Sequence, residues 1–199
     1  REEDRAKIIE FLRQNEFATL VTHDGEKPTA SHLLTEVFEE GEQIIVNGHM
    51  SRANPMWKTF ATSNEVLLIF QGAHTYISPT WYNHVNVPTW NYQAVHLYGK
   101  PRIIENHEEA YQILKRLIDR HETASHYKME ALPQNFVEKE IKGIVAFQIE
   151  VTRIEADAQP LQAPAWVPKA QEGKQVEKAP GDLNSRRRAL REKLAADVA

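Results

Sequence analysis

The sequence predicts a mainly antiparallel β-barrel with helices inserted singly between its strands. Two observations support this prediction: β-branched and apolar runs follow one another across short turns, and no repeat of about 20 to 50 residues is visible. Strands joined by tight turns favour an antiparallel barrel over a doubly wound parallel sheet. With 199 residues and a mass of 22.9 kDa, the chain is long enough for one domain with a substantial core.

The first part of the chain predicts a helix, three strands and a short second helix. Apolar residues at helical spacing follow an acidic start, which suits the first helix. The β-branched run after it ends at Asp24-Gly25, a strong hairpin signal, and a second turn is expected at Gly41. Asn54 stands where an N-cap belongs, before Pro55 at the first helical position. These elements are expected over residues 2–14, 17–22, 27–38 and 43–48 and from residue 55 onward.

The second part predicts three more strands, one helix and a closing strand. The first of these strands is almost continuously apolar, whereas the closing strand alternates with a period of two. The helix between them places apolar side chains on one face, namely Tyr111, Leu114, Leu117 and Ile118. The expected ranges are 65–72, 74–78 and 91–104 for the three strands, 107–122 for the helix and 142–154 for the closing strand.

A change of composition near Ala156 predicts where the folded domain ends. Residues 1–155 are expected to form the domain. Residues 156–184 contain four prolines with no helical or strand period, which predicts an irregular extension. Residues 185–199 are expected to form a short basic helix capped by Ser185, with a positive patch of Arg186, Arg187, Arg188, Arg191 and Lys193.

Composition excludes several classes of function. The chain has no cysteine, so disulfides, thiolate metal sites and cysteine nucleophiles are excluded, and a cytoplasmic location is the simplest expectation. No apolar run reaches the roughly 18 to 20 residues of a membrane helix, so no membrane partner is expected. The formal net charge of −4 argues against non-specific attraction to nucleic acid. Any DNA contact would be local, through the basic tail, although such runs are usually solvated helix faces.

Catalytic and metal motifs are missing from the sequence. Nine histidines are present, but none is in the H-E-x-x-H arrangement, and we expect no metal site. The nucleophile elbow G-x-S-x-G, the P-loop and the dinucleotide-binding G-x-G-x-x-G are also missing. We therefore assign no catalytic residue.

The segment "VNGHMSRANP" combines a strand end, a helix start and several donors. A phosphate would be well served there, because the helix start offers unpaired N–H groups, Ser51 a hydroxyl and Arg52 a charged fork. The alternative is that Asn54 is only a cap and Arg52 only a solvated cation. Spacing alone leaves both interpretations open.

The segment "ISPTWYNHVNVPTWNYQAVHLYG" is unusual for a buried strand, because it mixes five Trp and Tyr side chains with two prolines. Flat rings beside amide and imidazole groups are what a planar heteroaromatic ligand needs. The alternative is an aromatic barrel rim without a ligand.

Three blocks, "GHMSRANPMWKTF", "VLLIFQGAHTYISPTWY" and "VPTWNYQAVHLYG", resemble the PaiB-type FMN-binding negative transcriptional regulators over roughly residues 8–154. The resemblance implies an antiparallel split β-barrel like that of pyridoxamine-phosphate oxidases, FMN as cofactor at a homodimer interface, and repression of sporulation and degradative-enzyme synthesis. The family usually has proline at the position of Ala73, and its C-terminal Ser-Gln-Asn-Arg block has no counterpart after Ile154. The cofactor-binding residues implied are His32, His49, Ser51, Arg52, Asn54, Thr89, Trp90, Asn91 and Tyr92.

Three functional hypotheses follow. The first is an FMN-binding regulator that turns over no substrate. The second is a flavin-dependent oxidoreductase, because fold alone does not decide function. The third is an interaction module with an empty pocket.

Overall fold

A computed structural model describes residues 3–82 and 84–158. The chain divides into two compact units. In the described range, the first contains residues 3–73 and 92–158, and the second contains residues 74–91 apart from position 83. The predicted basic helix at residues 185–199 and almost all of the predicted extension at 156–184 lie outside the described residues. The domain boundary at residue 155 therefore stays a prediction.

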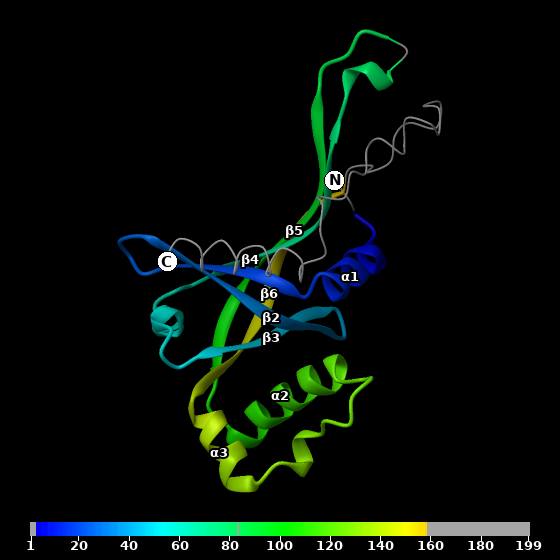
Figure 1. Cartoon of the computed structure of the whole chain (residues 1–199). Coiled ribbons are helices and arrows are strands. Elements are labelled where there is room, and N and C mark those ends of the chain that lie inside the picture. The colour runs from blue at the N-terminus through cyan, green and yellow to red at the C-terminus, as the bar shows by residue number, and fades with distance from the viewer. Residues whose placement is uncertain (1–2, 83, 159–199) are drawn as a thin grey trace, which may run out of the picture. The chain divides into compact units, whose positions relative to one another are not determined.

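Within the described residues, the strands form a closed antiparallel barrel in the order β1-β2-β3-β6-β5-β4 (Figure 1). The predicted barrel is thus confirmed. Closure comes from β1 pairing with β4, where Thr19, Leu20 and Val21 face Ile69, Leu68 and Leu67. The strands are β1 (Phe17–His23), β2 (Pro28–Glu40), β3 (Gln43–Ser51), β4 (Val66–Ile77), β5 (Thr89–Ile104) and β6 (Ile144–Ala158).

Both predicted hairpin turns are confirmed by the backbone. Gly25 has φ +100° and Gly41 has φ +62°, which are left-handed conformations that favour glycine. The Asp24 carboxylate accepts hydrogen bonds from the backbone N–H groups of Glu26 and Lys27, both at 2.9 Å, and these bonds lower the pKa of Asp24. The turns therefore fix the registers of β1–β2 and β2–β3.

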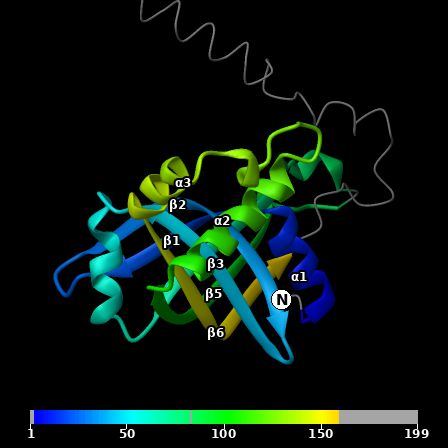
Figure 2. The ribbon, with the colours of Figure 1, turned by 90° about the horizontal axis from the view of Figure 1, so that it is seen from below.

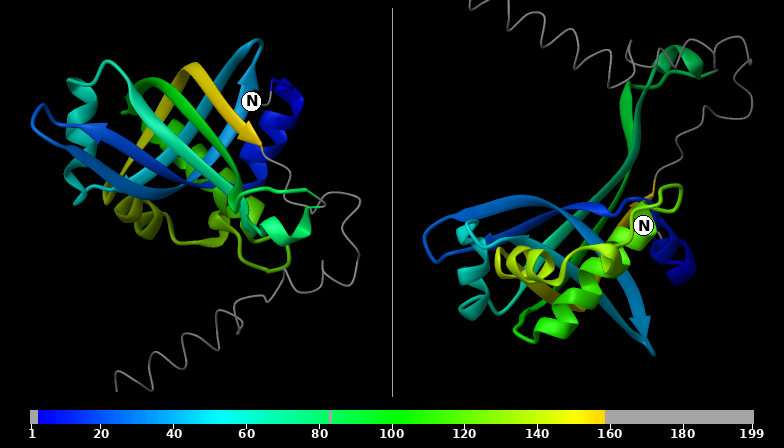
Figure 3. Two further views of the ribbon diagram at one scale, coloured as in Figure 1. Left: turned by 90° about the horizontal axis from the view of Figure 1, so that it is seen from above. Right: turned by 60° about the horizontal axis from the view of Figure 1, so that its bottom comes forward.

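The helices are α1 (Arg5–Gln14), α2 (His107–His121) and α3 (Gln134–Lys142), with short 3-10 helices η1 (Pro55–Ala61), η2 (Pro79–Trp81) and η3 (Met129–Ala131). α1 begins later than predicted: Asp4 is its N-cap and accepts from Ala6 and Lys7, so the acidic residues precede the first turn. The sequence prediction missed α3, which buries only Val137 and Ile141 and so has a weak apolar period. Around the barrel, α1 and η1 lie at opposite ends (Figure 3).

Two predicted boundaries need correction. β4 is one strand over Val66–Ile77, although a break near Ala73 was predicted, because the ladder continues through Gly72. A Cβ at Gly72 would lie 2.5 Å from Cε2 of Phe11, so this position leaves no room for a side chain beside α1. β6 also continues to Ala158, past the predicted end at Ile154, because β5 pairs with it as far as Gln93 opposite Ala158.

Two apolar clusters hold the first unit together. The larger fills the barrel and includes Leu20, Val46, Phe70 and Phe147, all fully buried. Gly48 is required there, because a Cβ would lie 2.6 Å from the Phe147 ring. The smaller cluster forms where α2 and α3 pack against the outside of the barrel (Figure 2), and consists of Ile104, Ala110, Ile113, Leu117, Met129, Val137, Ile141 and Ala146. The outer face of β2 and β3 is therefore covered by α2, which positions the site described next.

Candidate functional site

Arg52 follows the end of β3 and is tied to the start of β6. Its backbone N–H donates to the carbonyl of Gly143 at 2.8 Å. Its guanidinium donates from Nε to the carbonyl of Lys142 at 2.8 Å and from Nη2 to the carbonyl of Ile144 at 2.7 Å. The guanidinium is thus exposed and also hydrogen-bonded to two backbone carbonyls. Because a guanidinium has five N–H groups, others beyond these two bonds can still meet an anion.

The rest of the turn at residues 51–54 is also held by side-chain hydrogen bonds. Asn54 accepts from the backbone N–H of Met56 at 3.0 Å, as the predicted N-cap does, and its Nδ2 donates to Oγ of Ser31 at 2.9 Å. Ser51 Oγ accepts from the backbone N–H of Ala53 at 3.2 Å. Trp57 Nε1 donates to the carbonyl of Arg52, also at 3.2 Å. These bonds join β2, β3 and η1 around one turn.

His49 and Ser51 lie on the outer face of β3, because they alternate with Met50, which is buried in the barrel core. The His49 ring is half-buried, and its Nδ1 is buried with no hydrogen-bond partner among the described residues. Burial lowers the pKa of His49, which favours the neutral imidazole. His49 is therefore an orphaned polar group beside the turn.

His32 lies on the neighbouring strand β2 and is exposed. Its ring stacks on the exposed ring of Phe17, with centroids 6.0 Å apart. The residue before it, Ser31, is the acceptor of the Asn54 bond, so His32 is adjacent in sequence to a residue that contacts the turn. The predicted residues His49, Ser51, Arg52 and Asn54 thus share the region where β2, β3 and η1 meet, whereas the ring of His32 contacts Phe17 of β1.

The predicted aromatic residues divide between the two units. Tyr92 belongs to the first unit, whereas Thr89, Trp90 and Asn91 belong to the second. Within the second unit, the Trp90 ring lies 5.6 Å from His74 and 6.3 Å from Tyr76, measured between centroids. The rings of Trp90 and Tyr76 contact each other, and about half of each residue stays exposed, 53% for Trp90 and 46% for Tyr76.

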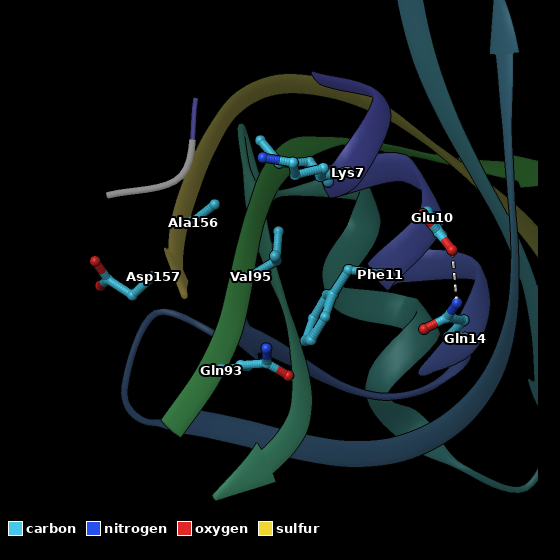
Figure 4. A pocket seen from close by; sticks show the side chains of 9 residues that line it. Lys7, Glu10, Phe11, Gln14, Gln93, Val95, Ala156 and Asp157 are labelled. Atoms are coloured by element: carbon cyan, nitrogen blue, oxygen red, sulfur yellow. Dashed lines mark hydrogen bonds between the residues drawn. The ribbon is translucent and has the colours of Figure 1, made fainter. Parts of the chain in front are cut away.

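A hollow that is separate from the turn lies between α1 and the ends of β5 and β6 (Figure 4). Phe11, Gln93 and Asp157 are among its walls, and Glu10 accepts a bond from Gln14 at its edge. None of the predicted site residues lines it in the described part of the chain.

Within residues 3–82 and 84–158, no group of three His, Asp or Glu side chains is placed to hold a metal ion. Among the same residues, no helix is both long and apolar enough to span a bilayer.

The donors around the turn match the chemistry of a phosphate ester. Ser51 supplies a hydroxyl and Arg52 supplies a cation whose position is set by two backbone carbonyls. The outer face beside them carries the imidazoles of His49 and His32. Sequence reasoning missed Ser31, Lys142 and Ile144, which position the turn. No local signal could have found the two carbonyls, because every residue offers one.

A closed antiparallel barrel with a donor-rich turn at the end of its third strand is consistent with the split-barrel proteins. The chain belongs to the family described as "Putative FMN-binding domain", whose model matches residues 1–153. It is also 40% identical over 152 residues to "Protease synthase and sporulation protein PAI 2" of Bacillus subtilis, which covers 75% of this chain and 73% of that protein. The family assignment made from the sequence blocks is therefore confirmed.

Solved structures agree with the fold. The flavocytochrome Anf3 from Azotobacter vinelandii superposes with a TM-score of 0.63 at 16% identity, covering 80% of this chain and 69% of that chain. A "Putative Pyridoxamine 5'-phosphate oxidase" from Listeria innocua gives a TM-score of 0.50 at 12% identity, covering 77% and 98%. At these identities the likeness shows the split-barrel fold alone. FMN as cofactor is supported by the family.

Proposed function

We propose that this protein is a cytoplasmic FMN-binding regulator that represses sporulation and degradative-enzyme genes. Support for the flavin comes from the family and from the donors at residues 51–54. Support for the regulatory role comes from the name of the Bacillus relative, a protease synthase and sporulation protein. Bound FMN would supply a redox-active ring system, and the residues of this chain would bind and orient it.

The observation that carries the flavin site is the fixed guanidinium of Arg52. Its bonds to the carbonyls of Lys142 and Ile144 hold the cation in place before any ligand arrives, so little side-chain entropy is lost on binding a phosphate. Ser51 would contact the same phosphate, and Asn54 would keep the turn in shape through Met56 and Ser31. His49 and His32 would border the ligand on the outer face of the sheet.

Titration with FMN and with riboflavin, which lacks the phosphate, tests this assignment. Arg52→Ala should weaken FMN binding about tenfold to a hundredfold and leave riboflavin nearly unchanged, because a charge-assisted bond contributes roughly 1.5 to 3 kcal/mol. Arg102→Ala is a matched control, since Arg102 is an exposed arginine that bonds Gln148 and Glu109 instead. If Arg52→Ala keeps the full preference for FMN over riboflavin, the phosphate assignment is wrong.

A homodimer would complete the flavin pocket. In the second unit, Trp90 is 53% exposed and Val87 is 71% exposed, and such apolar surface is typical of an interface core. We propose that Trp90 or Tyr92 of one copy contacts the flavin whose phosphate is held by Arg52 of the other, with Thr89 and Asn91 beside it. Mixing Arg52→Ala with Trp90→Ala after reversible dissociation should restore tight binding at about half of the sites in mixed dimers. Full FMN affinity in a verified monomer would refute the shared pocket.

One assay distinguishes the oxidoreductase alternative from the proposal that the protein is only a regulator. Anaerobic mixing of the FMN-loaded protein with NADH and NADPH should leave the flavin spectrum unchanged if the protein is only a regulator. Steady bleaching followed by reoxidation in air would support the enzyme instead.

Direct DNA contact is proposed through the basic tail. DNA binding in a gel-shift assay that weakens steeply with salt and is lost on deleting residues 185–199 would support it.

A further inference from the structure

A cavity of about 470 Å³ lies between α2 and the outer face of β2, β3 and β6. Its walls include Asn47 of β3, Gln148 of β6 and Ile113 of α2. In the described part of the chain, it shares no wall residue with the hollow beside α1, and none of the residues predicted to bind FMN lines it. A volume of this size falls in the range of small-molecule sites.

The strands form the cavity floor with a row of polar side chains that are direct neighbours across the sheet. Asn47 is paired with Glu36 of β2 on one side and with Gln148 on the other. Gln148 is paired in turn with Arg102 of β5. Arg102 Nη2 donates to Gln148 Oε1 at 2.8 Å, and Gln148 Nε2 donates to Asn47 Oδ1 at 3.3 Å. Because a guanidinium can only donate, these two bonds fix the orientation of both side-chain amides.

Asn47 is the buried member of this row, with 3% of its surface exposed. Its Oδ1 is used by Gln148, and its Nδ2 has no acceptor among the described residues. Among the same residues, the fully buried side-chain atoms without a partner are Glu16 Oε2 and His49 Nδ1, so Asn47 Nδ2 is not closed off. Since Asn47 lines the cavity, Nδ2 is a donor that a ligand in the cavity can satisfy.

The charged groups around the cavity favour a cation. Among the described residues that line it are three glutamates and one arginine, namely Glu36, Glu40, Glu109 and Arg116. Arg116 Nε donates to both carboxylate oxygens of Glu36, at 3.0 and 2.9 Å, and Arg102 Nη2 lies 3.4 Å from Glu109 Oε1. The carboxylate of Glu40 has no hydrogen bond or ion pair with any of the described residues. Glu40 is therefore the carboxylate left to meet a ligand.

Phe38 lies between the two unsatisfied groups. It shares the outer face of β2 with Glu36 and Glu40, because alternate residues of a strand point to the same side. Glu36 is the neighbour of Asn47, and Glu40 lies four residues, or about 13 Å, farther along β2. The half-buried ring of Phe38 and the side chain of Ile113 make this part of the wall apolar. The cavity thus offers an amide donor, an apolar middle and a carboxylate, in that order.

We propose that this cavity binds a small organic cation that carries an amide carbonyl at the other end of an aliphatic chain. The carbonyl oxygen accepts a hydrogen bond from Asn47 Nδ2, the chain lies against Phe38 and Ile113, and the cation pairs with Glu40. This site goes beyond the proposed flavin function and does not require FMN to be bound.

Titration of the ¹⁵N-labelled full chain with matched compounds tests the proposal. 6-Aminohexanamide has both groups, hexylamine lacks the carbonyl and hexanamide lacks the cation. All of them should shift the backbone amide signals of Phe38 and Ile113, but only the two amides should shift the side-chain NH₂ signals of Asn47. Relative to 6-aminohexanamide, hexylamine should bind about threefold to tenfold more weakly and hexanamide about twofold to fivefold more weakly.

Variants separate the two contacts. Glu40→Gln should weaken 6-aminohexanamide about twofold to fivefold and leave hexanamide unchanged. Glu42→Gln is the matched control, because Glu42 is an exposed glutamate of the same hairpin that does not line the cavity, and it should change neither affinity. Asn47→Leu should abolish the preference for 6-aminohexanamide over hexylamine. Should this buried substitution prevent folding, the Asn47 NH₂ signals of the wild type decide the same point.

Several results would overturn the proposal. One is that the signals of Phe38 and Ile113 do not move with 6-aminohexanamide, and another is that hexylamine binds as tightly. Equal weakening by Glu40→Gln and Glu42→Gln would show only a general attraction to a negative surface. Displacement of 6-aminohexanamide by saturating FMN would also overturn it, because the cavity would then belong to the flavin.

Discussion

The turn at residues 51–54 and residues 89–92 of the aromatic segment were both predicted to contact the ligand, but they are held in different ways. In the turn, Arg52 and Asn54 each make several hydrogen bonds to other elements of the first unit. In the aromatic segment, Trp90 contacts His74 and Tyr76 through its ring and remains half exposed. One region is fixed by this chain itself, and the other has apolar surface left to cover.

The difference shows that predicted binding residues can be held to different degrees by their own chain. The donors of the turn are preorganised, so their substitution should affect folding stability as well as affinity. The aromatic rings add little to folding, so their substitution should affect assembly and ligand binding alone. The following predictions test this contrast, from the largest expected change in stability to the smallest.

Asn54→Ala should have the largest effect on unfolding. It removes the cap of η1 and the bond to Ser31, which together should lower the free energy of unfolding by about 1 to 2 kcal/mol. Urea denaturation measures the change. Asn54→Asp keeps the cap and should recover part of the loss. An unchanged midpoint for Asn54→Ala would mean that the turn is not held by these bonds.

Arg52→Lys should destabilise the protein less, by about 1 kcal/mol, because the site is exposed and the freed carbonyls of Lys142 and Ile144 can bind water. Lysine keeps the charge but lacks the planar fork that reaches both carbonyls. Hydrogen exchange at the start of β6 should speed up in this variant. If exchange there matches the wild type, Arg52 does not fasten β3 to β6.

His49 should give a smaller, pH-dependent effect. Burial lowers its pKa in the folded state, so the unfolded chain binds the proton more tightly. The associated stability is present above the unfolded pKa of about 6.5 and is lost as pH falls toward the folded pKa. The urea midpoint should therefore fall less between pH 7.5 and pH 5.5 in His49→Gln than in the wild type. Equal falls in both proteins would contradict this role.

Trp90→Ala should have the smallest effect on folding, within about 0.5 kcal/mol at a concentration where the protein is monomeric. Its exposed ring leaves no cavity behind when removed. The same variant should nevertheless weaken self-association in analytical ultracentrifugation. Clear destabilisation of the monomer would place Trp90 in the fold rather than in an interface, and the contrast between the two regions would fail.

Much of the local structure could be predicted from the sequence. The hairpins at Gly25 and Gly41 and the cap at Asn54 depend on residues within one turn of each other, so short-range patterns are enough to identify them. The helix α3 was missed because Val137 and Ile141 give too weak an apolar period to stand out. The strand β4 was divided at Ala73 because glycine and alanine weaken a strand pattern that pairing with neighbours sustains.

By itself, the sequence determined most of the elements, the absence of thiol chemistry and the donors at the end of β3. Only the tertiary structure decided that Arg52 meets the carbonyls of Lys142 and Ile144, which are 90 and 92 positions away in the chain. It also decided that His49 is left with a buried nitrogen that has no partner among the described residues. The physical reason is that the pairing of β3 with β6 and the packing of α2 set which distant groups meet, and side-chain burial depends on those contacts rather than on local spacing.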